Sequence, residues 1–412
     1  MNHEHGKDKS TGRRARAKNA ILSLLVLLIA VAAMETASFL VLLFFSQQPD
    51  PRAAVPHLYD PYRSHRLNPD FHLKRDTSGR RIHSQDGFRR DTPVTKKKKV
   101  NTIRIIALGG SALYGIGSGA PYPYHPALRN DETITCFLQQ MINKRLKDDE
   151  MNLTAEVINA GVTAYETFQH LVYLNSVLLE YEPDWVINID GENDFYRYDP
   201  DHNHWMDYGY SSARLIDLVN HRSGFLSMHL FIRSLAPYSQ VFRLMEKFSK
   251  KRLQDMMHGE NPSEKQRDSF SAEGYLATAR RTFVRALWQI HNLGRLEGYD
   301  HLVFLQPKLL FEDNLLLSEH DRTIKDITRG KREPEYVETM GQMRGILPLL
   351  FEEHGIPFYD MGELGPFNKD RSDLYLDYCH LTPEGSKALA ERICDVLYPG
   401  IREKCQTEDL PN

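Results

Sequence analysis

The chain has 412 residues, of which 41% are hydrophobic and 26% charged, a composition typical of a folded protein rather than a disordered chain or a collagen-like fibre. Its 52 basic and 55 acidic residues give a net charge of −3, which argues against nucleic-acid binding because that function usually requires a basic excess. The four cysteines include no CxxC pair, so the sequence predicts neither a disulfide framework nor a structural zinc site.

The N-terminal segment predicts a membrane anchor. Residues 1–19 carry six Lys or Arg side chains against two acidic ones, and residues 20–45 follow as a mostly apolar run whose one charge is Glu35. As a helix, this run would extend about 39 Å at ~1.5 Å per residue, enough to cross a hydrocarbon core of ~30 Å. Because the basic residues precede the run, we expect residues 1–19 in the cytoplasm and the bulk of the chain outside it.

Two alternatives stay open in this segment. In a cleaved signal peptide, residues 21–33 would form the apolar core, but the apolar run resumes at residues 39–45, which a cleavable signal does not need. A charge such as Glu35 costs roughly 3 kcal/mol at mid-membrane. Either the sixteen Leu, Ile, Val and Phe residues of the run offset this cost, or a partner helix meets the carboxylate.

The next segment predicts little regular structure. Residues 46–100 are rich in Pro, Arg, Asp and His without a sustained period, and we interpret them as a linker and lead-in to a folded domain. Four consecutive lysines at residues 96–99 favour a solvated run, since a patch for anionic cytoplasmic lipid would lie on the wrong side of the membrane.

From residue 101, short apolar runs alternate with helical patterns, which predicts an α/β fold with a parallel sheet. Residues 195–268 interrupt the alternation and are interpreted as an insertion, with weak helical stretches near 213–219 and 241–251. The domain spans residues 101–398 and leaves 399–412 as a C-terminal tail. Five strands are expected at residues 103–108, 156–158, 185–189, 301–305 and 357–359, and helices at 133–147, 166–181, 271–296, 336–353 and 383–397, the last capped by Thr382.

The residues that follow the predicted strands supply the parts of an acyl-transfer site, because ligands of open parallel sheets bind beyond the carboxyl ends of the strands. Ser111 follows two glycines and offers a hydroxyl nucleophile, His380 is a base for its proton, and Asp377 is placed to orient the imidazole. Developing negative charge on the substrate oxygen needs preorganised donors. The backbone N–H groups of Ser111 and Gly161 and the side-chain amide of Asn193 are the candidates.

These segments resemble the SGNH (GDSL-like) hydrolases, a family named for Ser, Gly, Asn and His in four blocks. The resemblance covers about residues 101–398, and QDGFR at residues 85–89 is similar to the lead-in of membrane-anchored bacterial members. Gly110 stands where many members have Asp. The four blocks are GGSALYG at residues 109–115, NAG at 159–161, GEND at 191–194 and DYCHLTPEGSKALA at 377–390.

The resemblance implies a three-layer α/β/α sandwich with a five-stranded parallel sheet of flavodoxin-like type. It implies Ser111 as nucleophile, His380 as general base and then acid, and Asp377 as the residue that orients the imidazole. Gly161 and Asn193 would complete the oxyanion hole with the Ser111 N–H. The family needs no metal or other cofactor.

Rival motifs are less consistent with their surroundings. Residues 115–120 match the dinucleotide pattern GxGxx[GA], but they lie well after the strand and prolines follow, so no helix is expected to start there and hold a pyrophosphate. The nucleophile elbow GxSxG is absent because Leu113 stands where Gly is required.

Cysteines and other histidines leave minor alternatives. Cys379 is a second candidate nucleophile, although it adjoins His380 in sequence and neighbouring side chains usually point apart. A disulfide between Cys394 and Cys405 stays open if the domain is extracytoplasmic, and Cys136 is expected in the core. Three histidines of the insertion match no metal-ligand spacing, namely His202, His204 and His221.

The sequence therefore predicts a membrane-anchored serine esterase of the SGNH type outside the cytoplasm. Its expected partners are the membrane and an acylated glycan or lipid substrate, with acetyl esters among the candidates. One alternative is an O-acyltransferase that modifies an exported polysaccharide, but Asp377 and His380 lie downstream of Ser111, the hydrolase order. The other is a catalytically silent envelope scaffold, against which the retained site residues argue.

Overall fold

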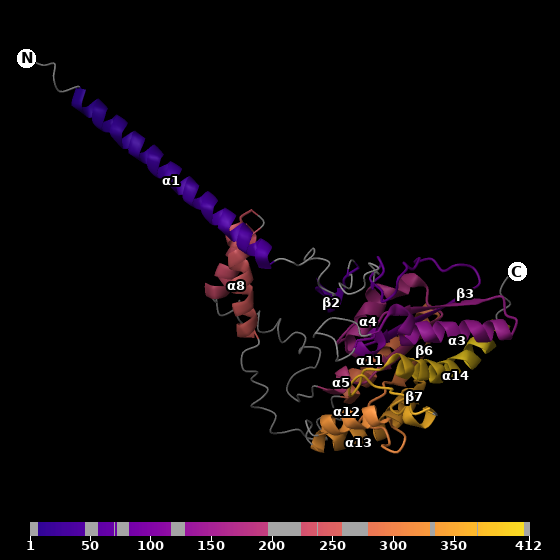
Figure 1. The fold of residues 1–412 in the computed structure, drawn as a ribbon. Coiled ribbons are helices and arrows are strands. Elements are labelled where there is room, and N and C mark those ends of the chain that lie inside the picture. Colours follow the sequence, from indigo (N-terminus) through magenta and orange to yellow (C-terminus); the bar gives the residue numbers. More distant parts are fainter. Residues whose placement is uncertain are drawn as a thin grey trace, which may run out of the picture. The chain divides into compact units, whose positions relative to one another are not determined.

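A computed structural model describes the chain as two compact units, Met1–Asp50 with Gly209–Lys265, and Pro51–Tyr208 with Gln266–Asn412 (Figure 1). The weak helix predicted near residues 213–219 lies outside the described residues, as do His202, His204 and His221. The described residues are 7–45, 57–69, 71, 82–116, 128–196, 224–236, 238–257, 279–329, 334–368 and 370–407.

The second unit is built on a parallel sheet of five strands in the order β4-β3-β5-β6-β7, and each of the five predicted strands is present. Counted along the chain this is the order 2-1-3-4-5, the flavodoxin-like arrangement, in which the strand order reverses between β3 and β5. The strands are β3 (Thr102–Gly109), β4 (Thr154–Asn159), β5 (Trp185–Asp190), β6 (Asp300–Leu305) and β7 (Phe358–Asp360).

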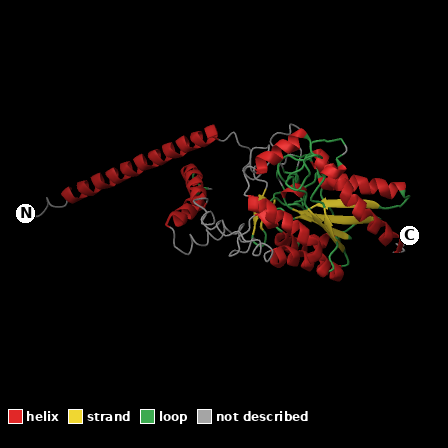
Figure 2. Cartoon of the chain, turned by 90° about the horizontal axis from the view of Figure 1, so that it is seen from below, coloured by secondary structure: helices red, strands yellow, loops and turns green. Residues whose placement is uncertain are grey.

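Helices cover both faces of this sheet, so the predicted three-layer α/β/α sandwich is confirmed (Figure 2). Alternate residues of β3 enter separate cores, Ile105 on one face and Ile106 on the other. Strands buried on both faces are continuously apolar, the pattern that marked them in the sequence. One face packs against α3 (Ile134–Asp148) and α14 (Pro383–Thr407), and the other against α4 (Thr167–Ser176), α11 (Arg285–Glu297) and α13 (Pro334–Glu353).

Several helix ends follow local sequence signals. Thr382 caps α14 as predicted, because its hydroxyl accepts a hydrogen bond from the Gly385 N–H at 3.0 Å. The predicted helix at residues 166–181 is divided into α4 and a 3₁₀ turn at Leu178–Tyr181. Of the helix predicted at residues 271–296, the described part begins with a π-helical turn at Ala279–Val284 and continues as α11.

The sequence does not predict two further strands and three further α-helices of this unit. The lead-in holds an antiparallel hairpin of β1 (His57–Asp60) and β2 (Ser64–Leu67), whose turn is closed by an ion pair from Arg63 to Asp60. The segment interpreted as a linker and lead-in therefore contains a pair of strands that no period in the sequence marks. The other elements are α2 (Ser111–Tyr114), α5 (Asn193–Tyr196) and α12 (Glu319–Arg329).

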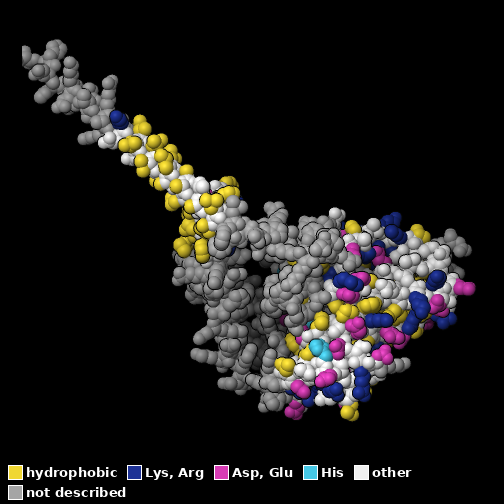
Figure 3. Space-filling view, in the orientation of Figure 1, with side chains coloured by type: hydrophobic (Ala, Val, Ile, Leu, Met, Phe, Trp, Pro, Cys, Tyr) yellow, Lys and Arg dark blue, Asp and Glu magenta, His cyan; other side chains and the backbone are white. Residues whose placement is uncertain are grey.

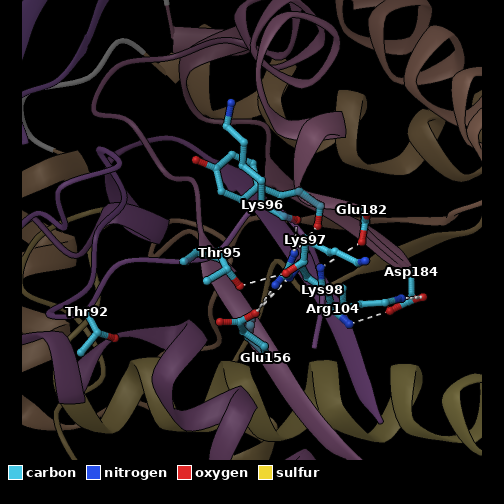
Figure 4. A network of polar contacts seen from close by, with 12 residues as sticks. Thr92, Thr95, Lys96, Lys97, Lys98, Arg104, Glu156, Glu182 and Asp184 are labelled. Atoms are coloured by element: carbon cyan, nitrogen blue, oxygen red, sulfur yellow. Dashed lines mark hydrogen bonds and ion pairs between the residues drawn. The ribbon is translucent and has the colours of Figure 1, made fainter. Parts of the chain in front are cut away.

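The lysine run at residues 96–99 lies just before β3 in the chain and pairs with acidic side chains (Figure 4). Lys96 pairs with Glu180, and Lys98 pairs with Asp184. Arg104 of β3, almost fully buried, donates to Glu156 at 2.9 Å in the same network. Lys96, Lys97 and Lys99 remain exposed, so the expected solvated run is present.

The first unit consists of three described helices, α1 (Lys7–Phe45), α7 (Gly224–Leu235) and α8 (Gln240–Met257). Within α1, residues Ile21–Val41 form a span with a mean hydropathy of 2.4, long and apolar enough to cross a membrane. Nearly all of its side chains are exposed, which distinguishes α1 from the core helix of a soluble protein. The helix α8 confirms the helical stretch predicted near residues 241–251, whereas α7 was not predicted.

Candidate active site

Ser111 lies at the carboxyl end of β3, at the point where the strand order reverses, and is the first residue of α2. Of the two preceding glycines, Gly109 is required by space, because a Cβ atom there would meet backbone, whereas one on Gly110 would meet the movable end of a side chain. A Cβ atom on Gly109 would lie 2.8 Å from the carbonyl oxygen of Ile189, and one on Gly110 would lie 2.5 Å from Nδ2 of Asn193. The two glycines therefore let the first block approach the end of β5, and they place the Ser111 hydroxyl at the sheet edge.

The structure brings Ser111, His380 and Asp377 into one chain of hydrogen bonds. Nε2 of His380 lies 2.7 Å from Oγ of Ser111, although 269 positions separate the two residues in the sequence. Nδ1 of His380 lies 2.7 Å from Oδ2 of Asp377. Because a carboxylate only accepts, the contact assigns the proton to Nδ1 and leaves Nε2 free to accept the hydroxyl proton of Ser111.

The carboxylate of Asp377 is held in place by its own loop. Its Oδ1 accepts the backbone N–H groups of Cys379 at 2.9 Å and of His380 at 2.8 Å. Burial raises the pKa of Asp377, but the hydrogen bond from His380 and the two backbone donors outweigh burial and hold the pKa below its usual value. The side chain therefore stays ionised, as the orienting residue of a triad must be.

Two buried acids fix the segment that leads to His380. Oδ2 of Asp321 accepts the N–H of Leu374 at 2.9 Å, and Oε1 of Glu312 accepts that of Leu364 at 2.6 Å. The hydroxyl of Tyr375 also donates to Glu312. These contacts join α12 and the loop before it to the turn that carries the imidazole, so His380 is positioned by packing as well as by Asp377.

The lead-in residues support the nucleophile from the other side. Arg89 donates to the carbonyl oxygens of Tyr114 at 3.0 Å and of Leu128 at 2.6 Å. His83, which is fully buried, lies with Nε2 2.7 Å from the hydroxyl of Tyr114. Because Tyr114 ends the short helix that Ser111 begins, these contacts fix the backbone that carries the nucleophile.

The candidate oxyanion donors Gly161 and Asn193 differ in their partners. Nδ2 of Asn193 donates to the carbonyl oxygen of Tyr165 at 2.9 Å and carries a second N–H. The N–H of Gly161 donates to Oδ1 of Asn159 at 2.9 Å, while Nδ2 of Asn159 donates to Leu113 in α2 at 2.8 Å. A role for Gly161 as an oxyanion donor therefore stays a prediction, and Asn159 links the second block to the first.

Gly161 is also required by space. A Cβ atom at this position would lie 2.8 Å from the backbone nitrogen of Tyr114 and 2.9 Å from Oδ1 of Asn159. Since the backbone atom cannot move without displacing α2, no larger residue fits beside the nucleophile.

A second Asp–His pair lies behind the third block. Nδ1 of His170 in α4 lies 3.1 Å from Oδ2 of Asp190, which also accepts from Nδ2 of Asn188 at 2.7 Å. Burial lowers the pKa of His170, but the charge and hydrogen bond of Asp190 outweigh it and raise the pKa above its usual value. Burial, with the charge of Asp190, raises the pKa of Asp194 to about 6, although the backbone N–H and hydroxyl of Thr167 both donate to its Oδ1.

A buried ion pair at the end of the third strand was not predicted from the sequence. Nζ of Lys308 lies 2.9 Å from Oε2 of Glu192 and 3.2 Å from the carbonyl oxygen of Gly191. Nε2 of Gln306 donates to the carbonyl oxygen of Cys379 at 3.1 Å and so ties the loop after β6 to the loop of His380. Both residues follow β6 within three positions, so the strand-end rule applied to the fourth strand would have found them.

Cys379 is unsuited to act as the nucleophile. It is 2% exposed, and burial together with the charges of Glu192 and Asp377 raises the pKa of its thiol well above the usual value. Asp377, Cys379 and His380 bring one ligand atom each within 4.8 Å of one another, but the two ligand atoms of Asp377 and His380 are engaged in the Asp–His–Ser chain. A protonated thiol is also a poor metal ligand.

All four cysteines are free, so the disulfide between Cys394 and Cys405 left open by the sequence is not formed. Cys136 is half-buried in α3 rather than part of the core, because it lies two positions from both Ile134 and Leu138, which face the sheet, and so points away from it.

No protein-family model matches the sequence, and no curated protein matches it. Among solved structures, the chain is similar to an acetyl xylan esterase, with 13% identity, coverage of 71% of this chain and 99% of that chain, and a TM-score of 0.35. It is similar to a lipase/acylhydrolase from Enterococcus faecalis, with 14% identity, coverage of 72% and 96%, and a TM-score of 0.36. A carbohydrate acetylesterase from Sinorhizobium meliloti has 13% identity, coverage of 72% and 98%, and a TM-score of 0.36.

Proposed function

We propose that the protein is a serine ester hydrolase that works through an acyl-Ser111 intermediate. The observation that carries this proposal is the unbroken chain of contacts from Ser111 through His380 to Asp377, with 2.7 Å at each step. A hydroxyl bonded to the accepting nitrogen of an imidazole, whose other nitrogen donates to an ionised carboxylate, is the arrangement that activates serine for attack on a carbonyl carbon.

The first half-reaction forms the acyl-enzyme. The hydroxyl proton of Ser111 passes to Nε2 of His380 while Oγ bonds to the ester carbonyl carbon. The Ser111 N–H in the first turn of α2 and the second N–H of Asn193 stabilise the oxyanion. The bond to the alcohol oxygen then breaks, and the proton of Nε2 passes to the departing alcohol.

Water completes the cycle by the same route in reverse. A water molecule gives a proton to Nε2 of His380 and bonds to the acyl carbon. When the tetrahedral intermediate collapses, the acid leaves and the proton returns to Oγ of Ser111. Asp377 keeps its negative charge throughout and stabilises the imidazolium that forms in both halves.

The N-terminal helix leads us to propose that the enzyme is anchored in a membrane by one pass, with its N-terminus in the cytoplasm. The apolar span Ile21–Val41 supports the anchor, and the basic residues before it support the orientation. An enzyme held in this way meets substrates at the cell envelope. The proposed substrate is therefore an acyl ester on an extracytoplasmic glycan or lipid.

The decisive experiment is hydrolysis of p-nitrophenyl acetate and butyrate by the full chain in detergent. We expect Ser111→Ala and His380→Ala each to lower kcat by about 10³-fold or more, since removal of a triad member leaves only the contribution of binding and oxyanion donors. Ser176→Ala, which changes an exposed serine of α4, is the matched control and should retain full activity.

Two results would contradict the proposal. One is hydrolysis that survives in Ser111→Ala, which would place the chemistry elsewhere. The other is a wild-type chain that is folded but inert toward both esters. Acetyl transfer to an added oligosaccharide acceptor would in that case support the acyltransferase alternative, and its absence would support a scaffold.

A further inference from the structure

The one charge of the apolar span is bound by a second helix of the same chain. The carboxylate of Glu35 accepts hydrogen bonds from the hydroxyl of Ser239 and from the backbone N–H of Gln240, and a longer one from the N–H of Val241 at 3.3 Å. Gln240 is the first residue of α8, so Glu35 caps the N-terminus of that helix. Of the two alternatives that the sequence left open for Glu35, the structure selects the partner helix.

This contact satisfies one unpaired polar group on each of the two helices. A lone carboxylate in a hydrocarbon core is expensive, and so are the first N–H groups of a helix, which have no partner within the helix. The negative charge also lies at the positive end of the helix dipole of α8. Glu35 lies six residues before the end of the span at Val41, which places the start of α8 about 9 Å inside that end at ~1.5 Å per residue.

The hairpin of α7 and α8 is closed by its own contacts. Nδ1 of His229 in α7 lies 2.9 Å from the hydroxyl of Ser249 in α8, and both residues are buried. The rings of Phe231 and Phe242 meet edge to face, with centroids 6.3 Å apart. The hairpin is therefore a packed element and not two separate helices.

Large apolar side chains nevertheless lie on the outside of this hairpin. Phe231 is 61% exposed and Phe248 is 68% exposed. Met228 and Met245 are nearly half exposed. On α8, positions 241, 245 and 248 share one helix face, and Figure 3 shows hydrophobic side chains of the hairpin continuing those of α1.

A basic flank adjoins this apolar face. Arg243 and Lys247 are exposed and lie four residues apart on α8, beside the apolar positions and not among them. The sequence of α8 holds five Lys or Arg residues against two acidic ones. An amphipathic helix with bulky apolar side chains on one side and basic ones on the other fits the interface of a bilayer with anionic headgroups.

We propose that the α7–α8 hairpin is bound to the membrane, with Phe231, Met245 and Phe248 in the acyl region at the extracytoplasmic side and Arg243 and Lys247 at anionic phosphate headgroups. The occupant of the apolar face is thus the phospholipid bilayer that α1 spans. This inference rests on the proposed anchor and deepens it. Glu35 joins the anchor to the hairpin, so the membrane holds the protein by three helices and not by one.

The test uses the full chain in vesicles of phosphatidylcholine and phosphatidylglycerol. A polarity-sensitive fluorophore is attached at Phe248→Cys, with the half-buried Cys136 and Cys405 changed to Ser. Brominated acyl chains then quench the fluorescence of a fluorophore that they contact. We expect several-fold more quenching at position 248 than at the neighbouring Lys247→Cys, which is the matched control on the basic flank.

Two further readouts separate the hairpin from the anchor and from catalysis. Resistance to extraction by alkaline carbonate reports insertion of α1, and ester hydrolysis reports the triad. We expect Glu35→Ala to lower quenching at position 248 to the level of position 247, while α1 stays resistant to carbonate. Equal quenching at positions 247 and 248 in a carbonate-resistant protein would overturn the hairpin proposal and leave the anchor and the esterase standing.

The remaining outcomes are also decisive. Extraction of the protein by carbonate would overturn the anchor and the hairpin together, whatever the hydrolysis assay shows. Full quenching at position 248 in Glu35→Ala would overturn the role assigned to Glu35. A silent hydrolysis assay with strong quenching at position 248 would contradict the esterase and leave the hairpin proposal intact.

Discussion

Two Asp–His pairs lie in the sheet unit and differ in what surrounds the imidazole. In Asp377–His380 the side chains are 14% and 15% exposed, and the imidazole also meets the hydroxyl of Ser111. In Asp190–His170 they are 3% and 0% exposed, and the carboxylate also accepts from the amide of Asn188. The first pair thus faces the Ser111 hydroxyl at the carboxyl ends of the strands, whereas the second is enclosed between β5 and α4.

This difference shows that a carboxylate–imidazole contact does not by itself mark a catalytic site. Each pair contains one group with a shifted pKa, because burial and charge act on any enclosed ionisable group. The pKa of His170 is raised and that of Asp377 is lowered. The Asp377–His380 pair differs from the Asp190–His170 pair in two ways: a substrate has access to it, and a hydroxyl lies at Nε2 of its imidazole. Substitutions in the first pair should therefore change kcat, and those in the second should change the free energy of unfolding.

The largest expected effect is that of Asp377→Asn on catalysis. Oδ1 of Asp377 accepts two backbone N–H groups, so the amide oxygen of the variant is expected to take that place and the amide nitrogen to face Nδ1 of His380. The amide nitrogen donates to Nδ1, so the imidazole carries its proton on Nε2 and loses Nε2 as an acceptor. We expect kcat for p-nitrophenyl acetate to fall by about 10⁴-fold, with little change in KM. A loss below tenfold would show that His380 does not depend on Asp377.

The enclosed pair should respond in the opposite way. Asp190→Ala leaves the imidazole of His170 and the amide of Asn188 without their shared acceptor. We expect the free energy of unfolding to fall by about 3–5 kcal/mol, the usual effect of removing one partner of a buried ion pair. Urea unfolding followed by circular dichroism measures this change.

Asp395→Ala is the matched control, because that carboxylate pairs with Arg145 while 61% exposed and should cost at most about 1 kcal/mol. If the two substitutions destabilise the fold equally, the enclosed pair contributes no more than a surface contact. If Asp190→Ala abolishes hydrolysis in protein that remains folded, the division between the two pairs is wrong.

Much of this arrangement follows from local sequence patterns. The strands β3 and β5 were predicted to within one residue at each end, because strands covered on both faces must be continuously apolar. Ser111 was predicted because it follows such a strand, and His380 and Asp377 were predicted because they lie in the loop before the last predicted helix. The distances between these three residues could not be predicted from the sequence. The two segments that carry them come together only when the loop before α14 packs at the end of β3 in the folded sheet.

Two of the elements that were not predicted contain buried polar groups in place of the apolar residues that would have marked them. The helix α12 has two Ile residues in eleven positions and buries Asp321 and Lys325, so few apolar residues mark its buried face. The β1–β2 hairpin consists of two four-residue strands closed by the pair of Asp60 and Arg63. In α12 the partners of the two polar groups lie outside the helix, at Leu374 and Glu312, and a single sequence does not show such bonds. The Asp60–Arg63 pair is local, but neither four-residue strand alternates apolar and polar residues.

A smaller effect is expected at the oxyanion donor of the third block. Asn193→Ala removes an amide N–H beside the nucleophile but leaves the Ser111–His380–Asp377 chain in place. We expect kcat to fall by about 10²–10³-fold, the usual effect of losing one such donor, with KM nearly unchanged. A rise in KM with kcat unchanged would instead assign Asn193 to substrate binding.

A further expected effect is a pH dependence of stability that arises away from the site. Burial lowers the pKa of both His83 and His301 from 6.5 to about 3, so each is neutral in the folded state above that value. In the unfolded state each takes up a proton near pH 6.5. Between these values the unfolded state holds up to two more protons, and the free energy of unfolding falls as the pH is lowered, by up to about 2.7 kcal/mol per pH unit.

His301→Gln tests this origin with little change in contacts, because an amide N–H can replace the bond from Nε2 of His301 to Oδ1 of Asn188 at 3.0 Å. Urea unfolding between pH 4 and pH 6.5 should give a slope smaller than that of the wild type by about 1.4 kcal/mol per pH unit, one proton fewer. The same substitution at His320, which is exposed on α12, is the control for the histidine change itself. An unchanged slope in His301→Gln would mean that the buried imidazole takes up its proton without unfolding. The interior around Asn188 would then accommodate a charged imidazole.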